Sequence, residues 1–517
     1  MTVRVKTVPS LRSTLAILLT VLASLAAAPT ANAASSMESI FQDDAVLLNS
    51  GLQTTRESLD EMRGLGVDTV HSLFVWAQIA PDRQETERPQ GFDAKDPSAY
   101  PAENWTKYDT LVREAAARGI DLLVTPTNPA PAWAGDCTTS DQRDTCVNRP
   151  SAREYAAFIT ALATRYSGSF PDPENPSQPL PRVRRWSFMN EPNLGAWLTP
   201  QFEKVKGRTV ASGIRIYRQL AYAAIDALRG SGHPRDAFYI AETAPVGGSS
   251  TKGADSKNPP RSFLRGLFCL DSRGRPLRDA GIGCGKRFRQ FPVSGITHHP
   301  YTFGAGAPPF TRSGPNDITI GFIPRLTGVL TQAARAKRIP RSAANRILFT
   351  EFGFQTNPPD GTFGVSWDKQ AEYLNLAEYL SYTTKQVRGV SQYELYDDPS
   401  TTSFNTGLRT CRAPQCTGTP KKPGYAAYRL PLYVVRNGSK RVRVFGWVRP
   451  ATDEQRVEIH LITGKGSAKR NTLLKTVTTR PTGILDVTLP RRTGEYQLAW
   501  TSGDQEFLSR GARVALR

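Results

Sequence analysis

The chain has 517 residues, a length that accommodates roughly two to four domains or a large barrel with an appended domain. Hydrophobic residues make up 39% and charged residues 22%, which excludes a wholly disordered chain and a polytopic membrane protein. The formal net charge is +20, which favours anionic partners in general. Because the cations form no long run, we interpret the charge as a solvated surface and expect no nucleic-acid partner; an acidic or cell-wall glycan is the lesser alternative.

The N-terminus has the layout of a secretion signal. Three cations within the first twelve residues precede an apolar run over Leu15–Ala28, and Ala31–Ala33 has the small-x-small pattern that signal peptidase cuts. A membrane anchor would need roughly 18 or more apolar residues, and this run is shorter. We therefore expect secretion with cleavage after Ala33 and no stable membrane insertion afterwards.

The six cysteines fall into three close pairs. In an oxidising compartment, such spacing favours disulfides that close local loops, although six cysteines also allow other pairings. There is no CxxC or Cys/His metal spacing, and the chain has only five histidines, so we expect neither a metal nor a cofactor. The predicted disulfides are Cys137–Cys146, Cys269–Cys284 and Cys411–Cys416.

Short β-rich segments alternate with amphipathic helical segments up to about residue 430. Eight such units predict an α/β fold in which parallel strands close into a (β/α)8 TIM barrel; the alternative is a doubly wound open sheet. The predicted strands are Ile40–Leu48, Thr69–Trp76, Leu122–Thr127, Val183–Met189, Ala237–Ala241, Gly295–Tyr301, Ile347–Phe352 and Val390–Leu395. The predicted helices include Arg56–Leu65, Trp105–Arg118, Arg153–Tyr166, Val210–Leu228, Ile323–Arg335 and Trp367–Thr384.

The hydrophobic pattern changes to period two from about Tyr433, in segments such as VRVFGWV and RVEIHLIT. This alternation predicts a small C-terminal all-β domain, most simply a sandwich. We therefore expect a signal peptide over 1–33, a catalytic-type barrel over 34–430 and a β-domain over 431–517. Trp447 and Trp500 lie in alternating strands of that domain and are predicted to be core residues.

Two glutamates follow predicted barrel strands directly. Glu191 lies in RRWSFMNEPN after the fourth strand, and Glu351 lies in RILFTEFGF after the seventh. An acid that follows an apolar strand is costly to bury unless it is paired or used. Two acids at the same barrel mouth suit the cleavage of a glycosidic bond, since one carboxyl must protonate the leaving oxygen while another attacks the sugar or directs water.

These motifs resemble clan A of the glycoside hydrolases, whose fourth barrel strand ends in Asn-Glu-Pro and whose seventh ends in a nucleophilic Glu. The matching residues are Asn190, Glu191 and Pro192, together with the segment Thr350–Gly353. The resemblance implies that Glu191 is the acid/base and Glu351 the nucleophile of a retaining mechanism, and that Asn190 binds the sugar 2-hydroxyl. Family 39, family 5 and an unassigned relative all remain open as the specific family.

Further segments are similar to the sixth strand and the substrate loops of the clan. In GITHHPYTF, strand parity places His299 and Tyr301 on one face and turns His298 away, and we expect the first two to bind substrate. The resemblance also implies that the side chains after the second, third and eighth strands line the sugar site. Those residues are Trp76, Trp133 and Tyr396, and Glu242 after the fifth strand is a further expected substrate contact or a rival acid.

The sequence therefore predicts a secreted retaining β-glycosidase that acts on a polysaccharide or oligosaccharide. In this interpretation Glu191 is protonated and Glu351 is ionised at the start of the reaction. The alternative is a non-catalytic protein that binds glycans or is attached to the cell wall, since the same barrel can serve recognition alone. The presence of both glutamates in their motifs favours the enzyme.

Overall fold

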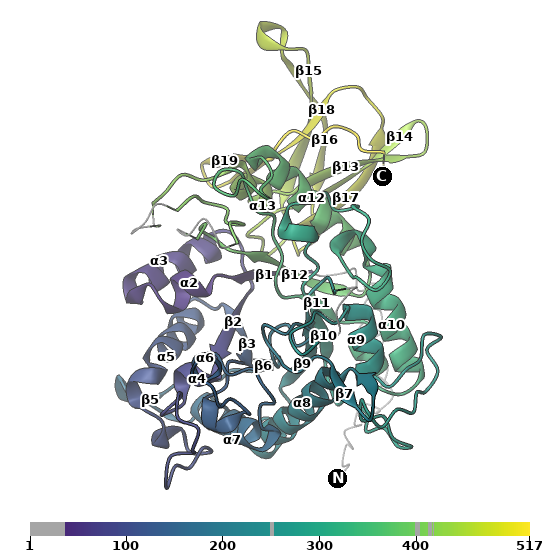
Figure 1. Ribbon diagram of the computed structural model, residues 1–517. Helices are drawn as coiled ribbons and strands as arrows, with labels where there is room; N and C mark the ends of the chain where they lie inside the picture. Colours follow the sequence, from purple (N-terminus) through teal and green to yellow (C-terminus); the bar gives the residue numbers. More distant parts are fainter. Residues whose placement is uncertain (1–36, 249–252, 399–403, 412–415, 417, 517) are drawn as a thin grey trace, which may run out of the picture. The chain divides into compact units, whose positions relative to one another are not determined.

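The computed structural model describes residues 37–516, apart from 249–252, 399–403, 412–415 and 417, and shows a closed barrel of eight parallel strands (Figure 1). The barrel strands are β1 (Glu38–Gln42), β2 (Thr69–Val75), β3 (Asp121–Thr127), β6 (Arg185–Trp186), β9 (Ala237–Thr243), β10 (Gly295–His298), β11 (Ile347–Phe349) and β12 (Val387–Tyr393). Each pairs with the strands before and after it in this list, and β1 pairs with β12 to close the ring. The predicted TIM barrel is confirmed.

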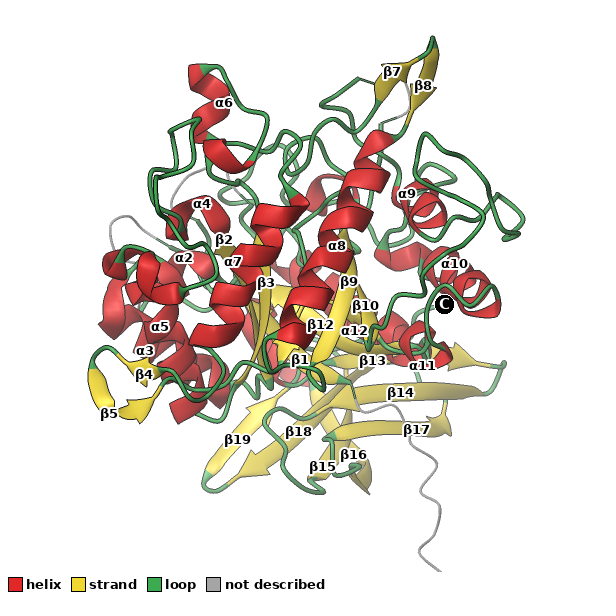
Figure 2. Cartoon of the chain, turned by 90° about the horizontal axis from the view of Figure 1, so that it is seen from below, coloured by secondary structure: helices red, strands yellow, loops and turns green. Residues whose placement is uncertain are grey.

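Helices surround the barrel strands (Figure 2). Strand β3 is buried at every position but its first, as expected for a parallel strand that is covered on both faces. Helix α7 starts with a Ser151 cap whose hydroxyl accepts from the Glu154 amide. The longer helices are α3 (Gly51–Gly64), α5 (Ala102–Ala117), α7 (Ala152–Arg165), α8 (Ser212–Gly230), α9 (Pro260–Leu267), α10 (Pro324–Arg335), α12 (Trp367–Thr383) and α13 (Pro423–Arg429). The shorter ones are α2 (Asp44–Leu48), α4 (Trp76–Ile79), α6 (Ser140–Asp144) and α11 (Arg341–Ala344).

The first predicted strand is too long in the sequence-based assignment. Strand β1 ends at Gln42, and the apolar segment that follows it forms helix α2. Asp43 explains the change, because its side chain accepts from the Val46 amide and so caps a helix. An apolar run of this length fits either element, and the cap decides it.

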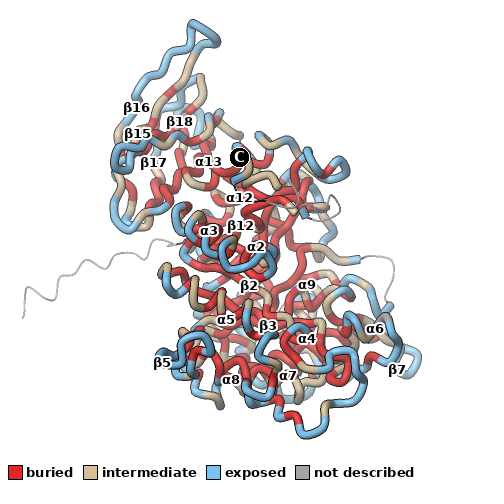
Figure 3. The backbone as a smooth tube through the Cα atoms, turned by 90° about the vertical axis from the view of Figure 1, so that its left-hand side faces the viewer, coloured by how far each residue is buried: buried red, intermediate tan, exposed pale blue. Residues whose placement is uncertain are grey.

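The C-terminal residues form two antiparallel sheets, as predicted for an all-β region. One sheet has the order β13-β14-β17 and the other the order β16-β15-β18-β19. Buried residues of both sheets share a hydrophobic cluster, and Trp447 and Trp500 are each only 3% exposed, as predicted for core residues. Buried positions also follow the barrel strands in Figure 3. The C-terminal strands are β13 (Leu432–Asn437), β14 (Arg441–Trp447), β15 (Arg456–Thr463), β16 (Arg470–Thr478), β17 (Ile484–Pro490), β18 (Glu495–Ser502) and β19 (Gln505–Leu508).

The three predicted disulfides are present, between Cys137 and Cys146, between Cys269 and Cys284, and between Cys411 and Cys416. Disulfides are typical of proteins that mature in oxidising compartments. The predicted signal peptide lies outside the described residues. Within the part of the chain that the structure describes, no helix combines the length and apolar character needed to cross a bilayer.

Candidate active site

The two motif glutamates lie beyond the carboxyl ends of their strands. Glu191 follows β6, Glu351 follows β11, and His299 comes directly after β10. Because all barrel strands are parallel, these three residues belong to the same face of the barrel, where TIM-barrel enzymes build their active sites. The side chains of Glu191 and Glu351 are 16% and 11% exposed, so both carboxyls are reachable but mostly shielded from water.

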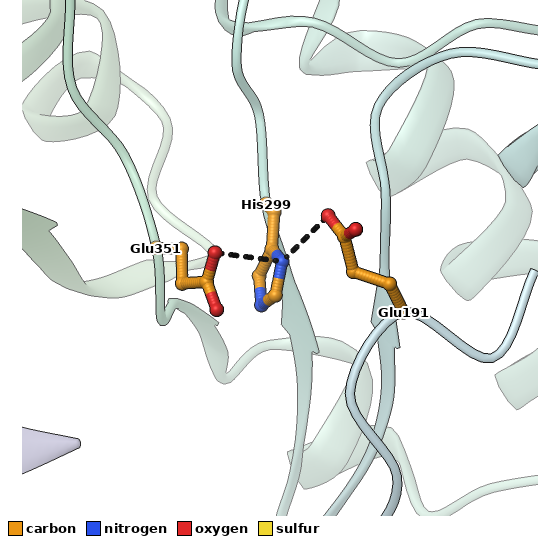
Figure 4. Close-up of side chains that lie close together, drawn as sticks. All are labelled: Glu191, His299 and Glu351. Atoms are coloured by element: carbon orange, nitrogen blue, oxygen red, sulfur yellow. Dashed lines mark hydrogen bonds and ion pairs between the residues drawn. The ribbon is translucent and has the colours of Figure 1, made fainter. Parts of the chain in front are cut away.

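His299 lies between the two glutamates (Figure 4). Its Nδ1 is 3.0 Å from Oε1 of Glu191 and 3.5 Å from Oε2 of Glu351. One carboxylate oxygen of each glutamate and a ring nitrogen of His299 all lie within 4.8 Å of one another. The structure therefore brings together the two predicted catalytic residues and one predicted substrate-binding residue.

Strand parity correctly separates the two neighbouring histidines. His298 turns away from the glutamates: its Nδ1 lies 2.8 Å from the Thr243 hydroxyl and its Nε2 lies 2.8 Å from the Ile318 carbonyl oxygen. Burial lowers the pKa of His298 to about 3, so its ring is neutral at ordinary pH. Tyr301 lies on the side of His299, as predicted, and its hydroxyl donates to Oε2 of Glu351 over a long 3.5 Å.

Asn190 offers an unused acceptor next to Glu191. Its backbone amide donates to the Thr127 hydroxyl at 2.9 Å, which fixes the segment before Glu191. Its side-chain oxygen Oδ1 is buried and has no hydrogen-bond partner. Since buried polar atoms are nearly always paired, this oxygen is available for a hydroxyl group of a ligand.

The backbone that carries these groups is strained at two strand ends. Met189 and Glu191 after β6 have φ values of 61° and 39°, and Ala241 and Glu242 at the end of β9 have φ values of 103° and 43°. The Glu191 amide donates to the Glu242 carbonyl oxygen at 3.0 Å and so joins the two segments. Non-glycine residues in the left-handed region cost free energy and cluster at functional sites.

The charges of the site differ from the sequence-based assignment of an ionised Glu351. Burial raises the pKa of Glu351 to about 7; the charge of His299 opposes this rise and the charge of Glu191 adds to it. For His299, burial would lower the pKa, but the charge of Glu351 and the hydrogen bond with Glu191 raise it well above its usual value. Burial therefore favours the protonated form of Glu351, and the positive charge of His299 favours its carboxylate form.

Glu242 lies on the other side of His299 from the two glutamates and has no exposed surface at the barrel mouth. Its side chain is fully buried, and its Oε2 is 2.8 Å from His299 Nε2 and accepts from the Thr350 hydroxyl at 2.7 Å. This placement corrects the expectation of a direct substrate contact, because the protein itself occupies the surroundings of the carboxylate. The sequence indicated a third acid at a strand end but gave no signal of its depth.

Trp76 and Trp133 also differ from the expected open aromatic lining. Trp76 is fully buried and its ring stacks on Phe158, with centroids 5.6 Å apart and an interplanar angle of 11°. Trp133 is 9% exposed, its indole nitrogen donates to the Pro81 carbonyl oxygen, and its ring packs edge-on against Trp76. The expectation that both rings are open to a sugar is therefore corrected: they belong to the core beside the barrel mouth.

Substitution of Trp133 by alanine should lower stability rather than activity per folded molecule. Loss of a buried Trp costs about 3 to 5 kcal/mol, because it removes apolar contacts and leaves a cavity. The melting temperature and kcat/KM should be measured on the same variant, with the partly exposed Trp367→Ala as the control for loss of an indole. A large fall in kcat/KM at unchanged melting temperature would return Trp133 to the binding site.

Tyr396 faces away from the glutamate pair. It is 4% exposed, and its hydroxyl donates to Glu61 on α3 at 3.2 Å. The aromatic residues near Glu351 are instead Tyr393 and Phe404, whose rings lie 6.4 and 5.6 Å from the ring of Tyr301. Phe404 is 44% exposed and is the first residue of FNTGL, a segment that resembles a substrate loop of the clan.

One group of described residues has the spacing of a metal site, namely Glu191, His299 and Glu351. We interpret it as a cluster of charges, because each ring nitrogen of His299 already faces a carboxylate oxygen. A chelator should therefore leave activity unchanged. The check is dialysis against EDTA followed by an activity assay; a loss that added Zn²⁺ reverses would show that the group binds a metal.

The sequence matches no family model and no curated protein. Solved structures similar to the chain include a family 1 β-glucosidase from Thermotoga maritima, with 13% identity, coverage of 72% of this chain and 84% of the other, and a TM-score of 0.44. Fpglu1 from Fervidobacterium pennivoraus is 13% identical, with coverage of 76% of this chain and 94% of the other and a TM-score of 0.45. GH5_18 from Streptomyces cattleya, solved with GlcNAc, is 17% identical, with coverage of 77% of this chain and 79% of the other and a TM-score of 0.46. At this level of similarity we take no residue role from these structures.

Proposed function

We propose that the chain is a secreted glycoside hydrolase that cleaves β-O-glycosidic bonds with retention of configuration. The observation that carries the proposal is the pair of carboxyls, Glu191 and Glu351, on one face of the barrel with an oxygen of each within 4.8 Å. Retaining enzymes hold their carboxyls about 5 to 5.5 Å apart, whereas inverting enzymes need about 6.5 to 9.5 Å to admit a water molecule. The nearest oxygens of Glu191 and Glu351 are at most 4.8 Å apart, which is compatible with the retaining arrangement.

In the first step, Glu351 attacks the anomeric carbon while Glu191 donates a proton to the leaving oxygen. The bond between sugar and leaving group breaks, and an ester forms between the sugar and Glu351. The negative charge of Glu351 disappears in this step. Tyr301, which donates to Glu351 in the free site, can then turn to the ring oxygen or the ester.

In the second step, Glu191 is a carboxylate and takes a proton from water, which attacks the anomeric carbon and releases the sugar. His299 contacts both carboxyls and is suited to offset the negative charge that moves between them. The unpaired Oδ1 of Asn190 is suited to accept a hydrogen bond from a sugar hydroxyl. No cofactor is required for either step.

A panel of aryl β-glycosides and polysaccharides tests the proposal. Hydrolysis should be seen on at least one substrate, and the anomer that forms first, followed by proton NMR, should have the configuration of the substrate. Release of the opposite anomer would contradict retention. Binding of a glycan without hydrolysis would support the alternative of a non-catalytic glycan-binding or wall-attached protein.

A further inference from the structure

The side chain of Glu242 is fully buried, and it contacts the substrate in neither step of the proposed reaction. Its two oxygens are surrounded by polar groups: His299 and Thr350 at Oε2, and the Thr125 hydroxyl at 3.5 Å and His71 at 3.9 Å on the side of Oε1. A buried carboxylate that is retained in a barrel core must be compensated by such partners. The question is which of its neighbours carries the compensating charge.

His71 does not carry that charge at neutral pH. Its side chain is fully buried between Gln42 and the Thr125 hydroxyl, and burial lowers its pKa to about 4. For Glu242, burial would raise the pKa, but the nearby histidines lower it to about 2. His299 is therefore the cation that faces Glu242.

The geometry of His299 favours a proton on both ring nitrogens, because carboxyl oxygens face each of them. Nε2 is 2.8 Å from Glu242, and Nδ1 is 3.0 Å from Glu191 and 3.5 Å from Glu351. A neutral imidazole has one N–H and one acceptor nitrogen, and an acceptor nitrogen facing an ionised carboxylate is repelled. Only the imidazolium donates in both directions, through Nε2 toward Glu242 and through Nδ1 toward the catalytic pair. Figure 4 shows the two catalytic carboxyls on either side of the ring.

We propose that Glu242 is a positioning residue that keeps His299 as a fixed imidazolium between the two catalytic carboxyls. The proposal deepens the proposed function and rests on it for the meaning of the carboxyl pair. A cation held against both carboxyls favours loss of one of their protons, while the proximity of the carboxyls to each other opposes loss of the second. The site thereby holds a single shared proton, which is the state that retaining hydrolysis requires.

The effect of Glu242→Gln follows with a definite sign. Glutamine still accepts a hydrogen bond from His299 Nε2 but carries no charge, so His299 becomes neutral and its Nδ1 accepts a hydrogen bond from a protonated carboxyl of the pair. Among the other titratable groups around His299 in the described part of the chain, Glu191 and Glu351 face Nδ1, and His71 and His298 are neutral. None of them replaces the lost anion on the Nε2 side. The pair then releases its first proton at a higher pH.

The first experiment measures the charge of His299 without any substrate. The chain has only five histidines, so ¹⁵N-labelled histidine gives few signals, and His299→Gln assigns the relevant one. In the unaltered protein both ring nitrogens of His299 should stay protonated at pH values where a free imidazole is neutral, and in Glu242→Gln one of them should lose its proton at a lower pH. A neutral His299 in the unaltered protein, or an imidazolium that persists in the variant, overturns the proposal even if the protein is a glycosidase.

The second experiment follows kcat/KM against pH on an activated aryl glycoside. In Glu242→Gln the acidic limb should move to higher pH by on the order of one pH unit. Thr125→Val is the matched control, since it removes a hydrogen bond to Glu242 and keeps the charge of that residue. Its pH profile should not move, whatever its melting temperature. If Glu242→Gln folds normally and the acidic limb of its pH profile does not move, the role of Glu242 is purely structural. If the unaltered protein hydrolyses no glycoside, the proposed function is contradicted, but the NMR result on His299 still stands.

Discussion

Glu351→Gln should abolish turnover while the barrel stays folded. The amide has the shape of the carboxylate but cannot form the covalent ester, so kcat should fall by a factor on the order of 10⁴ or more. The measurement is the hydrolysis rate of the best aryl glycoside, with circular dichroism as the check on folding. Glu372→Gln on α12, an exposed glutamate, is the matched control and should be fully active. Activity in a folded Glu351→Gln variant would remove the nucleophile assignment.

The same substitution should flatten the dependence of stability on pH. The pKa of Glu351 is raised by burial from 4.5 to about 7, so the folded protein holds this proton more tightly than the unfolded chain does. The stability that this group contributes is complete below about pH 4.5 and is lost as the pH rises through about 7. Glutamine does not titrate, so the melting temperature of the variant relative to the unaltered protein should rise between about pH 5 and about pH 8.

Glu191→Ala should affect substrates according to their leaving groups. General acid catalysis is typically worth about 10² to 10⁴ in rate, and that contribution matters only when the leaving oxygen needs a proton. The variant should therefore lose that factor on a natural oligosaccharide and far less in the first step on a dinitrophenyl glycoside. Glu458→Ala on β15 serves as the control on a distant sheet. Equal losses on both substrates would move the acid role away from Glu191.

The alkaline limb of the pH profile is the second readout of Glu191. If Glu191 supplies the proton, the unaltered protein should slow on poor leaving groups once the pH is high enough to remove that proton. In Glu191→Ala there is no acid to lose, and this limb should disappear. Persistence of the limb in the variant would assign the titrating proton to another group.

The barrel and the glutamate pair were predictable because their signals are local. Alternating apolar strands and helices define the fold class, and an acid directly after a strand must lie at the carboxyl end of a parallel barrel. Strand parity then distinguished His299 from His298, since neighbouring side chains on a strand face opposite ways. The charge state of Glu351 was not predictable, because it depends on how deeply the barrel mouth buries it.

The positions of the aromatic side chains near the site could not be predicted from local sequence patterns. Trp76 and Trp133 follow strands, as rim residues do, but helix α7 supplies Phe158 and encloses Trp76. Tyr393 and Tyr396 are three residues apart, and the irregular backbone at the end of β12 decides which of them turns toward Tyr301. Whether a ring is covered depends on tertiary packing between distant segments, which periodicity does not encode.

Helix α12 packs against the C-terminal sheets, and these contacts limit which domains could replace the C-terminal β-region. Arg449 is buried, its guanidinium lies 2.5 Å from Glu378 on α12, and it stacks over Trp447 at 4.0 Å. Tyr382, also on α12, stacks on Phe445 of β14 with centroids 4.8 Å apart. Removal of one partner from a buried ion pair costs about 3 to 5 kcal/mol. A chimera that places a different domain after the barrel would therefore need a redesigned α12 surface.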